Sequence, residues 1–261
     1  QHLDLGKISN QYNLYGNGSF LFSFPDPYRE KIDTNLWMSL HPDPRSVLLI
    51  GGLGGGYLVS LLAHNLELLD YVKLDAGVLD VARGYGGQPL VQALDADNVR
   101  VHTTDARRFV RQTSERYDVV VVALPDPSTA LLNRFYTKEF YTEARRILKP
   151  KGILITDVEA PGNYLTGEIG VYAASVYWTL RDTFPNVSVL ANGSIIFVAS
   201  LGPPPPLKNP DVLVERLRSR ETSSDTFVPE SILTRLLPHR IEAVRKSLDT
   251  LESVGRNSDI S

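Results

Sequence analysis

The chain has 261 residues and a formal net charge of −3, with 43% hydrophobic and 22% charged residues. This composition is typical of a globular protein and excludes general disorder, while the slightly acidic balance argues against a surface that neutralises nucleic-acid phosphates. The sequence has no cysteine, which excludes disulfides, thiolate catalysis and cysteine-ligated metals, and its five histidines lie too far apart to indicate a metal site.

Residues 1–40 have the pattern of a small antiparallel β unit. Apolar and polar residues alternate near Leu3 and Tyr12 and again over 20–24, and Asn17-Gly18 is a strong hairpin-turn signal. A helix is expected after this unit, through Leu36 and Trp37. We therefore predict an N-terminal β-hairpin unit.

Residues 41–201 alternate wholly apolar strands with helices, which is typical of a parallel sheet covered on both faces. Five strands are expected, each followed by a helix, and two short strands then follow closely enough to pair as an antiparallel edge. The strands are expected at 47–50, 71–75, 99–102, 117–122 and 152–156, with the edge pair at 187–190 and 195–200. The predicted fold class is α/β, a doubly wound, mostly parallel sheet, Rossmann-like in the manner of class I methyltransferases.

Residues 202–261 are expected to form a proline linker at 203–206 and a helical tail with helices at 211–220 and 238–251. No apolar run in the chain approaches the roughly 18 residues of a membrane span. Because the chain begins at Gln1 and its only methionine is Met38, we expect a fragment of a longer protein.

The glycine-rich loop after the first sheet strand contains Gly51, Gly52 and Gly54 and precedes a helix. Glycines in this place let backbone amides approach a nucleotide at a helix amino terminus. The alternative is a tight strand-to-helix turn with no ligand. No Lys-Ser or Lys-Thr follows the glycines, which excludes a phosphate-gripping P-loop.

Two aspartates follow the second and third strands. Asp75 stands two residues beyond the position at which a dinucleotide site places an acid for the ribose hydroxyls, and it is the candidate for that contact. Asp105, beside Ala106, stands where a carboxylate accepts an adenine amino group. Each aspartate has a second interpretation, because aspartate is also a common cap at the start of a helix.

Carboxylates also follow the fourth and fifth strands. Asp126 comes after the fourth strand, and Asp157 and Glu159 come at the end of the fifth. Because ligands of open α/β sheets bind at the carboxyl edge, we expect a cation-attracting pocket there, with solvated loop acids as the alternative.

Several segments resemble the spermidine synthase family, the polyamine aminopropyltransferases, over about residues 1–200. These segments are His41-Pro42-Asp43-Pro44-Arg45, the glycine loop, Asp105-Ala106, and residues 11–15, 117–121, 124–130 and 133–141. The sequence is most similar to the branch in which such a domain is fused to membrane segments.

The resemblance implies transfer of an aminopropyl group from decarboxylated S-adenosylmethionine to a polyamine, with methylthioadenosine released and no metal or prosthetic group. It assigns cosubstrate binding to the first strand, the glycine loop and the adenine-recognising pair, that is, to Gln1, Gly51, Gly52, Asp105 and Ala106. It assigns acceptor binding to Asp126 and Glu159, and Asp126 is the candidate catalytic residue.

The sequence departs from the family pattern at positions that carry chemistry. Gly54 replaces a loop aspartate, Lys73 replaces the ribose-binding glutamate, and Ala123 replaces the aspartate that accepts the proton. The Arg29-Glu30 pair aligns with a family Tyr-Gln or Tyr-His pair. The expectation is therefore weak or altered aminopropyl transfer.

Two other functions remain open at this point. One is a non-catalytic domain that binds a nucleoside or polyamine, or that regulates a membrane protein; the other is an S-adenosylmethionine-dependent methyltransferase. The expected partners are a polyamine, attached membrane segments and, as one option, a second copy in a homodimer, but no nucleic acid. An adenosyl ligand favours the cytoplasmic side, with the chain as the soluble domain of a membrane protein.

Overall fold

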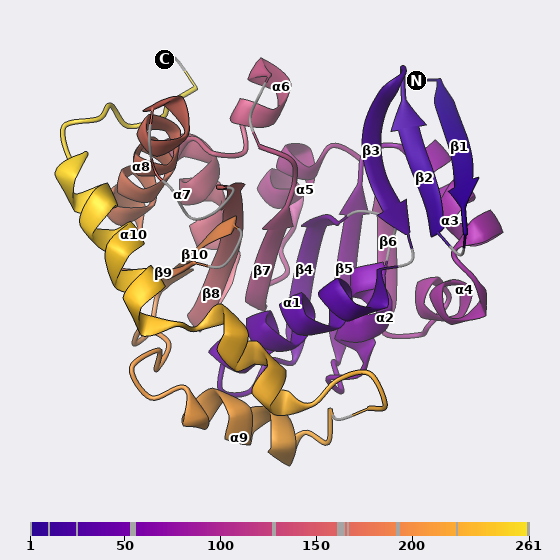
Figure 1. Cartoon of the computed structure of the whole chain (residues 1–261). Helices are drawn as coiled ribbons and strands as arrows, with labels where there is room; N and C mark the ends of the chain where they lie inside the picture. Colours follow the sequence, from indigo (N-terminus) through magenta and orange to yellow (C-terminus); the bar gives the residue numbers. More distant parts are fainter. Residues whose placement is uncertain are drawn as a thin grey trace.

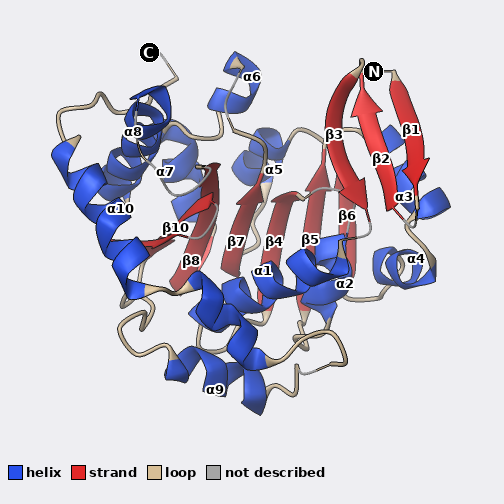
Figure 2. Ribbon diagram, viewed as in Figure 1, coloured by secondary structure: helices blue, strands red, loops and turns tan. Residues whose placement is uncertain are grey.

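The computed structural model describes residues 2–9, 11–24, 26–52, 56–126, 129–160, 165, 167–191, 194–222 and 224–259 (Figure 1). Its sheet strands lie side by side with helices packed against them, and a smaller three-stranded unit stands at one end (Figure 2). Within the described ranges, no helix is both long enough and apolar enough to cross a bilayer.

The N-terminal unit is an antiparallel sheet of β1 (Leu3–Ile8), β2 (Gln11–Gly16) and β3 (Ser19–Phe24), in that order. Asn17 and Gly18 adopt positive φ angles of 51° and 79°, as expected for the predicted hairpin turn. Leu14 and Phe24 form a small core with Val78, which lies on α3 (Ala76–Tyr85). The unit therefore packs against the second strand-to-helix crossover.

The main sheet has seven strands in the order β6-β5-β4-β7-β8-β10-β9. Its strands are β4 (Ser46–Gly51), β5 (Leu68–Lys73), β6 (Val99–Thr103), β7 (Tyr117–Ala123), β8 (Leu148–Glu159), β9 (Asn186–Ala191) and β10 (Ser194–Ser200). All neighbours from β6 to β8 are parallel, and β10 pairs antiparallel with both β8 and β9. The predicted doubly wound, mostly parallel sheet with an antiparallel edge is confirmed.

Helices cover both faces of this sheet, and its central strands β4, β5 and β7 are therefore buried along nearly their whole length. On one face lie α1 (Pro27–Leu40), α2 (Gly56–Leu62), α3, α4 (Gln88–Leu94), α9 (Asp211–Ser219) and the short 3-10 helix η2 (Pro229–Arg235). On the other lie α5 (Ala106–Gln112), α7 (Lys138–Arg146), α8 (Gly167–Thr183) and α10 (Pro238–Thr250). The four-residue helix α6 (Ala130–Asn133) follows β7. The sequence did not predict α4 or η2.

The chain reverses its direction of travel through the sheet at β4. It adds β5 and β6 on one side of β4 and then returns to place β7 on the other. This reversal opens a crevice at the carboxyl ends of the strands, where open α/β sheets bind ligands. The glycine loop turns sharply at this edge, because Gly51 and Gly52 adopt φ angles of 81° and 72°, which other residues rarely adopt. The Gly52 N–H donates to the Ala123 carbonyl oxygen over 2.8 Å, which holds the loop against the end of β7.

A side chain at Gly51 should destabilise the protein. In Gly51→Ala the new Cβ would lie 2.5 Å from the Ala123 carbonyl oxygen, at a backbone conformation that L-residues rarely adopt. We expect the free energy of unfolding, measured by urea denaturation, to fall by about 2 kcal/mol or more. Gly84→Ala is the matched control, because Gly84 lies in α3 with open space around it and should keep or raise stability. Equal stability of the two variants would contradict this account.

Candidate functional site

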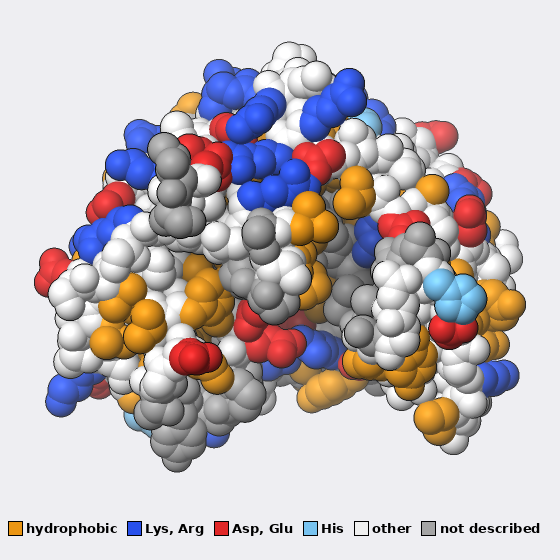
Figure 3. All heavy atoms as spheres, turned by 90° about the horizontal axis from the view of Figure 1, so that it is seen from above, with side chains coloured by type: hydrophobic (Ala, Val, Ile, Leu, Met, Phe, Trp, Pro, Cys, Tyr) orange, Lys and Arg blue, Asp and Glu red, His pale blue; other side chains and the backbone are white. Residues whose placement is uncertain are grey.

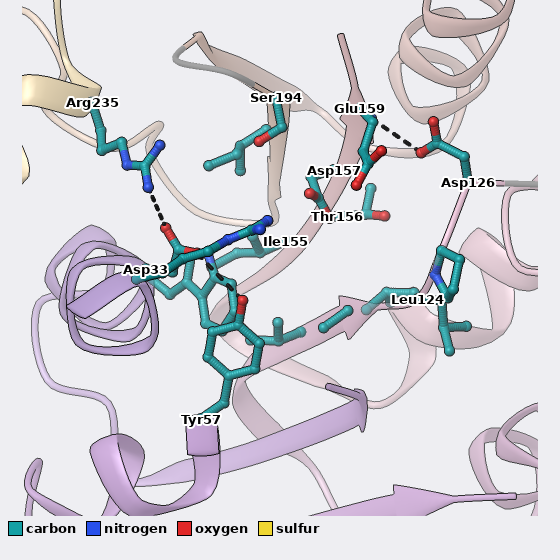
Figure 4. Close-up of a pocket in the computed structure, with 17 residues that line it drawn as sticks. Asp33, Tyr57, Leu124, Asp126, Ile155, Thr156, Asp157, Glu159, Ser194 and Arg235 are labelled. Carbon is teal, nitrogen blue, oxygen red and sulfur yellow. Dashed lines mark hydrogen bonds and ion pairs between the residues drawn. The ribbon is translucent and has the colours of Figure 1, made fainter. Parts of the chain in front are cut away.

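A cavity of about 570 Å³ opens at the carboxyl edge of the sheet, on the face covered by α1 and α2. Its walls come from α1, α2, the end of β7 with the segment after it, β8, β10 and η2 (Figure 4). Figure 3 views this edge and shows acidic side chains gathered near its middle. The charged side chains that line the cavity are Arg29, Asp33, Asp126, Asp157, Glu159 and Arg235.

Both arginines that line the cavity form ion pairs with Asp33. The Asp33 carboxylate lies 3.5 Å from Nε of Arg29 and 3.2 Å from Nη2 of Arg235, and the Tyr57 hydroxyl donates to it over 3.3 Å. Burial raises the pKa of Asp33, and the two arginines oppose that rise. This group lies on one side of the cavity in Figure 4.

Three further carboxylates line the cavity: Asp126 and Glu159 lie across it from Asp33, and Asp157 lies between them and the Asp33 carboxylate (Figure 4). The backbone N–H of Glu159 donates to Oδ1 of Asp126 over 3.1 Å, which ties the segment after β7 to the end of β8. Among the described residues, none of these three carboxylates is in an ion pair. The cavity therefore carries negative charge that a cationic ligand can neutralise.

The pKa values of two of these acids respond to that environment. Burial, with the negative charges of Asp33 and Asp126 adding to it, raises the pKa of Asp157 to about 7. Burial also raises the pKa of Asp126. Perturbed carboxylates that line one cavity are characteristic of functional sites, because stability alone does not favour collecting like charges.

The glycine loop contacts Lys73 at the end of β5. Its Nζ donates to the Gly52 carbonyl oxygen over 2.9 Å, and the Tyr71 hydroxyl donates to the same oxygen over 3.3 Å. Burial lowers the pKa of Lys73 to about 8. An amine therefore occupies the strand end at which the resemblance implies a ribose-binding carboxylate.

Asp75 and Asp105 both cap helices, which was one of the two interpretations of each. Asp75 accepts the Gly77 N–H over 2.8 Å at the start of α3, and Asp105 accepts the Arg108 N–H over 2.9 Å at the start of α5. The Asp105 carboxylate also forms an ion pair with Arg134, which follows α6. Ala106 is buried beside it in the first turn of α5.

The site residues expected from the sequence thus fall into two groups along one edge of the sheet. Asp126 and Glu159 line the cavity. The others lie at or just after the ends of β4, β5 and β6 and are not among the residues that line it; they are Gly51, Gly52, Asp75, Asp105 and Ala106. Gln1 and Gly54 lie outside the described residues.

Sequence reasoning missed Asp33 and Arg235, and it named Arg29 and Glu30 only as a departure from the family pattern. The spacing of Arg29 and Asp33 places both on one face of α1, which is a usable signal, but Arg235 lies some 200 positions later. Burial raises the pKa of Glu30 to about 7, and its carboxylate stands where a Cβ at Gly56 would lie. A larger residue at the start of α2 would therefore displace the Glu30 carboxylate.

Comparison with known proteins identifies the domain. Residues 26–172 match the model of the spermine/spermidine synthase domain. The polyamine aminopropyltransferase of Oceanobacillus iheyensis is 32% identical over 208 residues, which cover 77% of this chain and 38% of that protein. The chain therefore spans well under half the length of that curated relative.

Solved structures share the fold. A spermidine synthase in complex with the transition-state analogue AdoDATO superposes with a TM-score of 0.75 at 23% identity, over 95% of this chain and 88% of that one. The spermidine synthase of Thermotoga maritima gives a TM-score of 0.73 at 23% identity, over 95% and 87%. Because the domain model covers more than half of its residues, the chain belongs to the spermine/spermidine synthase family.

Proposed function

We propose that the cavity at the carboxyl edge binds a polyamine, and that the domain transfers an aminopropyl group to it from decarboxylated S-adenosylmethionine. The observation that carries this proposal is the set of three carboxylates, Asp126, Asp157 and Glu159, that line the cavity without forming an ion pair among the described residues. A polyamine is a chain of ammonium groups joined by methylenes. The polar and apolar walls of the cavity suit both parts of such a chain.

The reaction depends mainly on positioning. A neutral amine nitrogen must lie in line with the carbon–sulfur bond of the sulfonium cosubstrate, and carboxylates that hold the other ammonium groups fix that orientation. Membership of the family and the shared fold support this reading of the cavity.

The nucleoside is expected to bind beside Gly52, next to the acceptor cavity. Lys73 weakens that binding, because its ammonium group donates to the Gly52 carbonyl oxygen and has no lone pair with which to accept hydrogen bonds from the ribose hydroxyls. Loss of a bidentate contact of this kind costs about 2 kcal/mol, roughly 30-fold in affinity. The proposed activity is therefore weak relative to an enzyme with a carboxylate at this position.

A second candidate function is polyamine binding without transfer. The specific observations that favour it are Lys73 at the glycine loop and Ala123 in the place of the family proton acceptor. Saturable spermidine binding with no methylthioadenosine binding would select this candidate. The fusion to membrane segments, the homodimer and the cytoplasmic side stay predictions from the sequence.

Spermidine should bind the chain, and removal of a cavity carboxylate should weaken the binding. By isothermal titration calorimetry, we expect Glu159→Gln and Asp126→Asn each to raise the Kd for spermidine about tenfold, because each removes one charge-assisted contact. Glu168→Gln is the matched control, since Glu168 is exposed at the start of α8. An unchanged Kd in both cavity variants, or no spermidine binding by the wild type, would refute the proposal.

Lys73→Glu should strengthen nucleoside binding, because it supplies a carboxylate for the ribose hydroxyls. We expect the Kd for methylthioadenosine, also measured by calorimetry, to fall roughly 30-fold. Lys73→Met is the control, since it removes the amine without adding an acceptor and should give a much smaller gain. If the two variants bind methylthioadenosine equally, the nucleoside does not lie at the end of β5.

A further inference from the structure

Aminopropyl transfer needs a proton acceptor, and the side chain of Ala123 cannot supply one. The strand next to it offers a substitute. Val122 of β7 pairs with Thr156 of β8 in parallel register, so that Ala123 and Asp157 are the next residues along two adjacent strands. Adjacent strands lie about 4.8 Å apart, which places Asp157 beside the position where the carboxylate is missing.

The two side chains also share a face of the sheet. Along β7, Val121 and Ala123 pack toward the face of α1, whereas Val122 packs toward the other. Along β8, Ile155 packs toward the α1 face and Leu154 toward the other. Because side chains alternate along a strand, Asp157 follows Ile155 onto the same face as Ala123, and both line the cavity.

We propose that Asp157 is the proton acceptor for the attacking amine, and that its carboxylate replaces from β8 the one that β7 lacks at Ala123. This inference rests on the proposed function, because it concerns the amine bound in the same cavity. Asp126 is less suited to this role, because its Oδ1 already accepts the Glu159 N–H.

The step balances with the groups named. The ammonium group of the polyamine gives one proton to the Asp157 carboxylate and becomes a neutral amine. The amine lone pair then forms a bond to the aminopropyl carbon of the sulfonium nucleoside. The carbon–sulfur bond breaks, its electron pair returns to sulfur, and methylthioadenosine leaves as a neutral thioether. The new secondary ammonium carries the positive charge.

The charges around Asp157 set its proton affinity. The titratable and charged groups around Asp157 come from both faces of the sheet. On the cavity side they are Arg29, Asp33, Tyr57, Asp126, Glu159 and Arg235, and the hydroxyls of Tyr136, just before α7, and Tyr172, on α8, also interact with it electrostatically. With the pKa of Asp157 at about 7, the carboxylate is ionised above pH 7 and protonated below it. The transfer rate should therefore fall as the pH falls through 7.

Proton release on spermidine binding tests this role without requiring turnover. At pH 7, before binding, the ammonium group of spermidine carries one titratable proton and the Asp157 carboxylate carries about half a proton on average. In the ion pair that they form, the two groups share only one proton. Calorimetry in two buffers of different ionisation enthalpy should thus report release of about half a proton at pH 7, declining towards pH 9. Asp157→Asn should bind spermidine with this release lost, and Asp80→Asn, at an exposed position on α3, should keep it.

The rate gives the second readout. Asp157→Asn should lower the transfer rate about a hundredfold or more and remove its decline below pH 7. Ala123→Asp introduced into Asp157→Asn should restore much of the rate, because it returns a carboxylate to the same corner of the cavity. Equal proton release by wild type and Asp157→Asn would overturn the role of Asp157 while leaving polyamine binding intact. Absence of spermidine binding by the wild type would overturn both.

Discussion

Like charges held together in a partly buried cavity are the constraint on which this site depends. Asp126, Asp157 and Glu159 line the cavity together, and its two arginines both lie against a fourth carboxylate, that of Asp33. Bringing three carboxylates together in this way opposes folding unless they are neutralised. A protein can lower that cost by protonation, which the raised pKa of Asp157 reflects, or by binding a cation. A polyamine provides the cation in a form that matches several carboxylates at once.

The topology of the sheet explains why the charges meet there. β7 and β8 are parallel neighbours, so the residues that follow them emerge at one edge. The reversal at β4 keeps that edge open, and the hydrogen bond from Gly52 to the Ala123 carbonyl brings the glycine loop against the end of β7. A cosubstrate beside the loop and an acceptor in the cavity would therefore be neighbours.

The same geometry shows how one carboxylate can replace another. On two adjacent parallel strands, residues in register with their side chains on the same face occupy neighbouring positions in space. Ala123 and Asp157 have this relationship. A catalytic group lost from one strand can in this way be supplied by the next strand with little change in the backbone.

The sequence predicted the main sheet and the N-terminal unit well, because runs such as residues 47–50 and 117–122 are long, apolar and bounded by turn signals. It missed α4, which is only seven residues long and begins next to Pro89. Asp126 and Glu159 could be placed at the site because one lies shortly after the end of β7 and the other at the end of β8. The ion pair of Asp33 with Arg235 and the hydrogen bond of Lys73 to Gly52 could not be predicted from the sequence, because both depend on how distant segments pack.

The most direct test of the central claim is a crystal structure of this chain grown with spermidine. The account predicts an extended polyamine in the cavity, with one amine nitrogen within hydrogen-bond distance, about 3 Å, of the Asp157 carboxylate and another near Asp126 or Glu159. A cavity without spermidine at saturating concentration, or spermidine bound only at another surface, would contradict it.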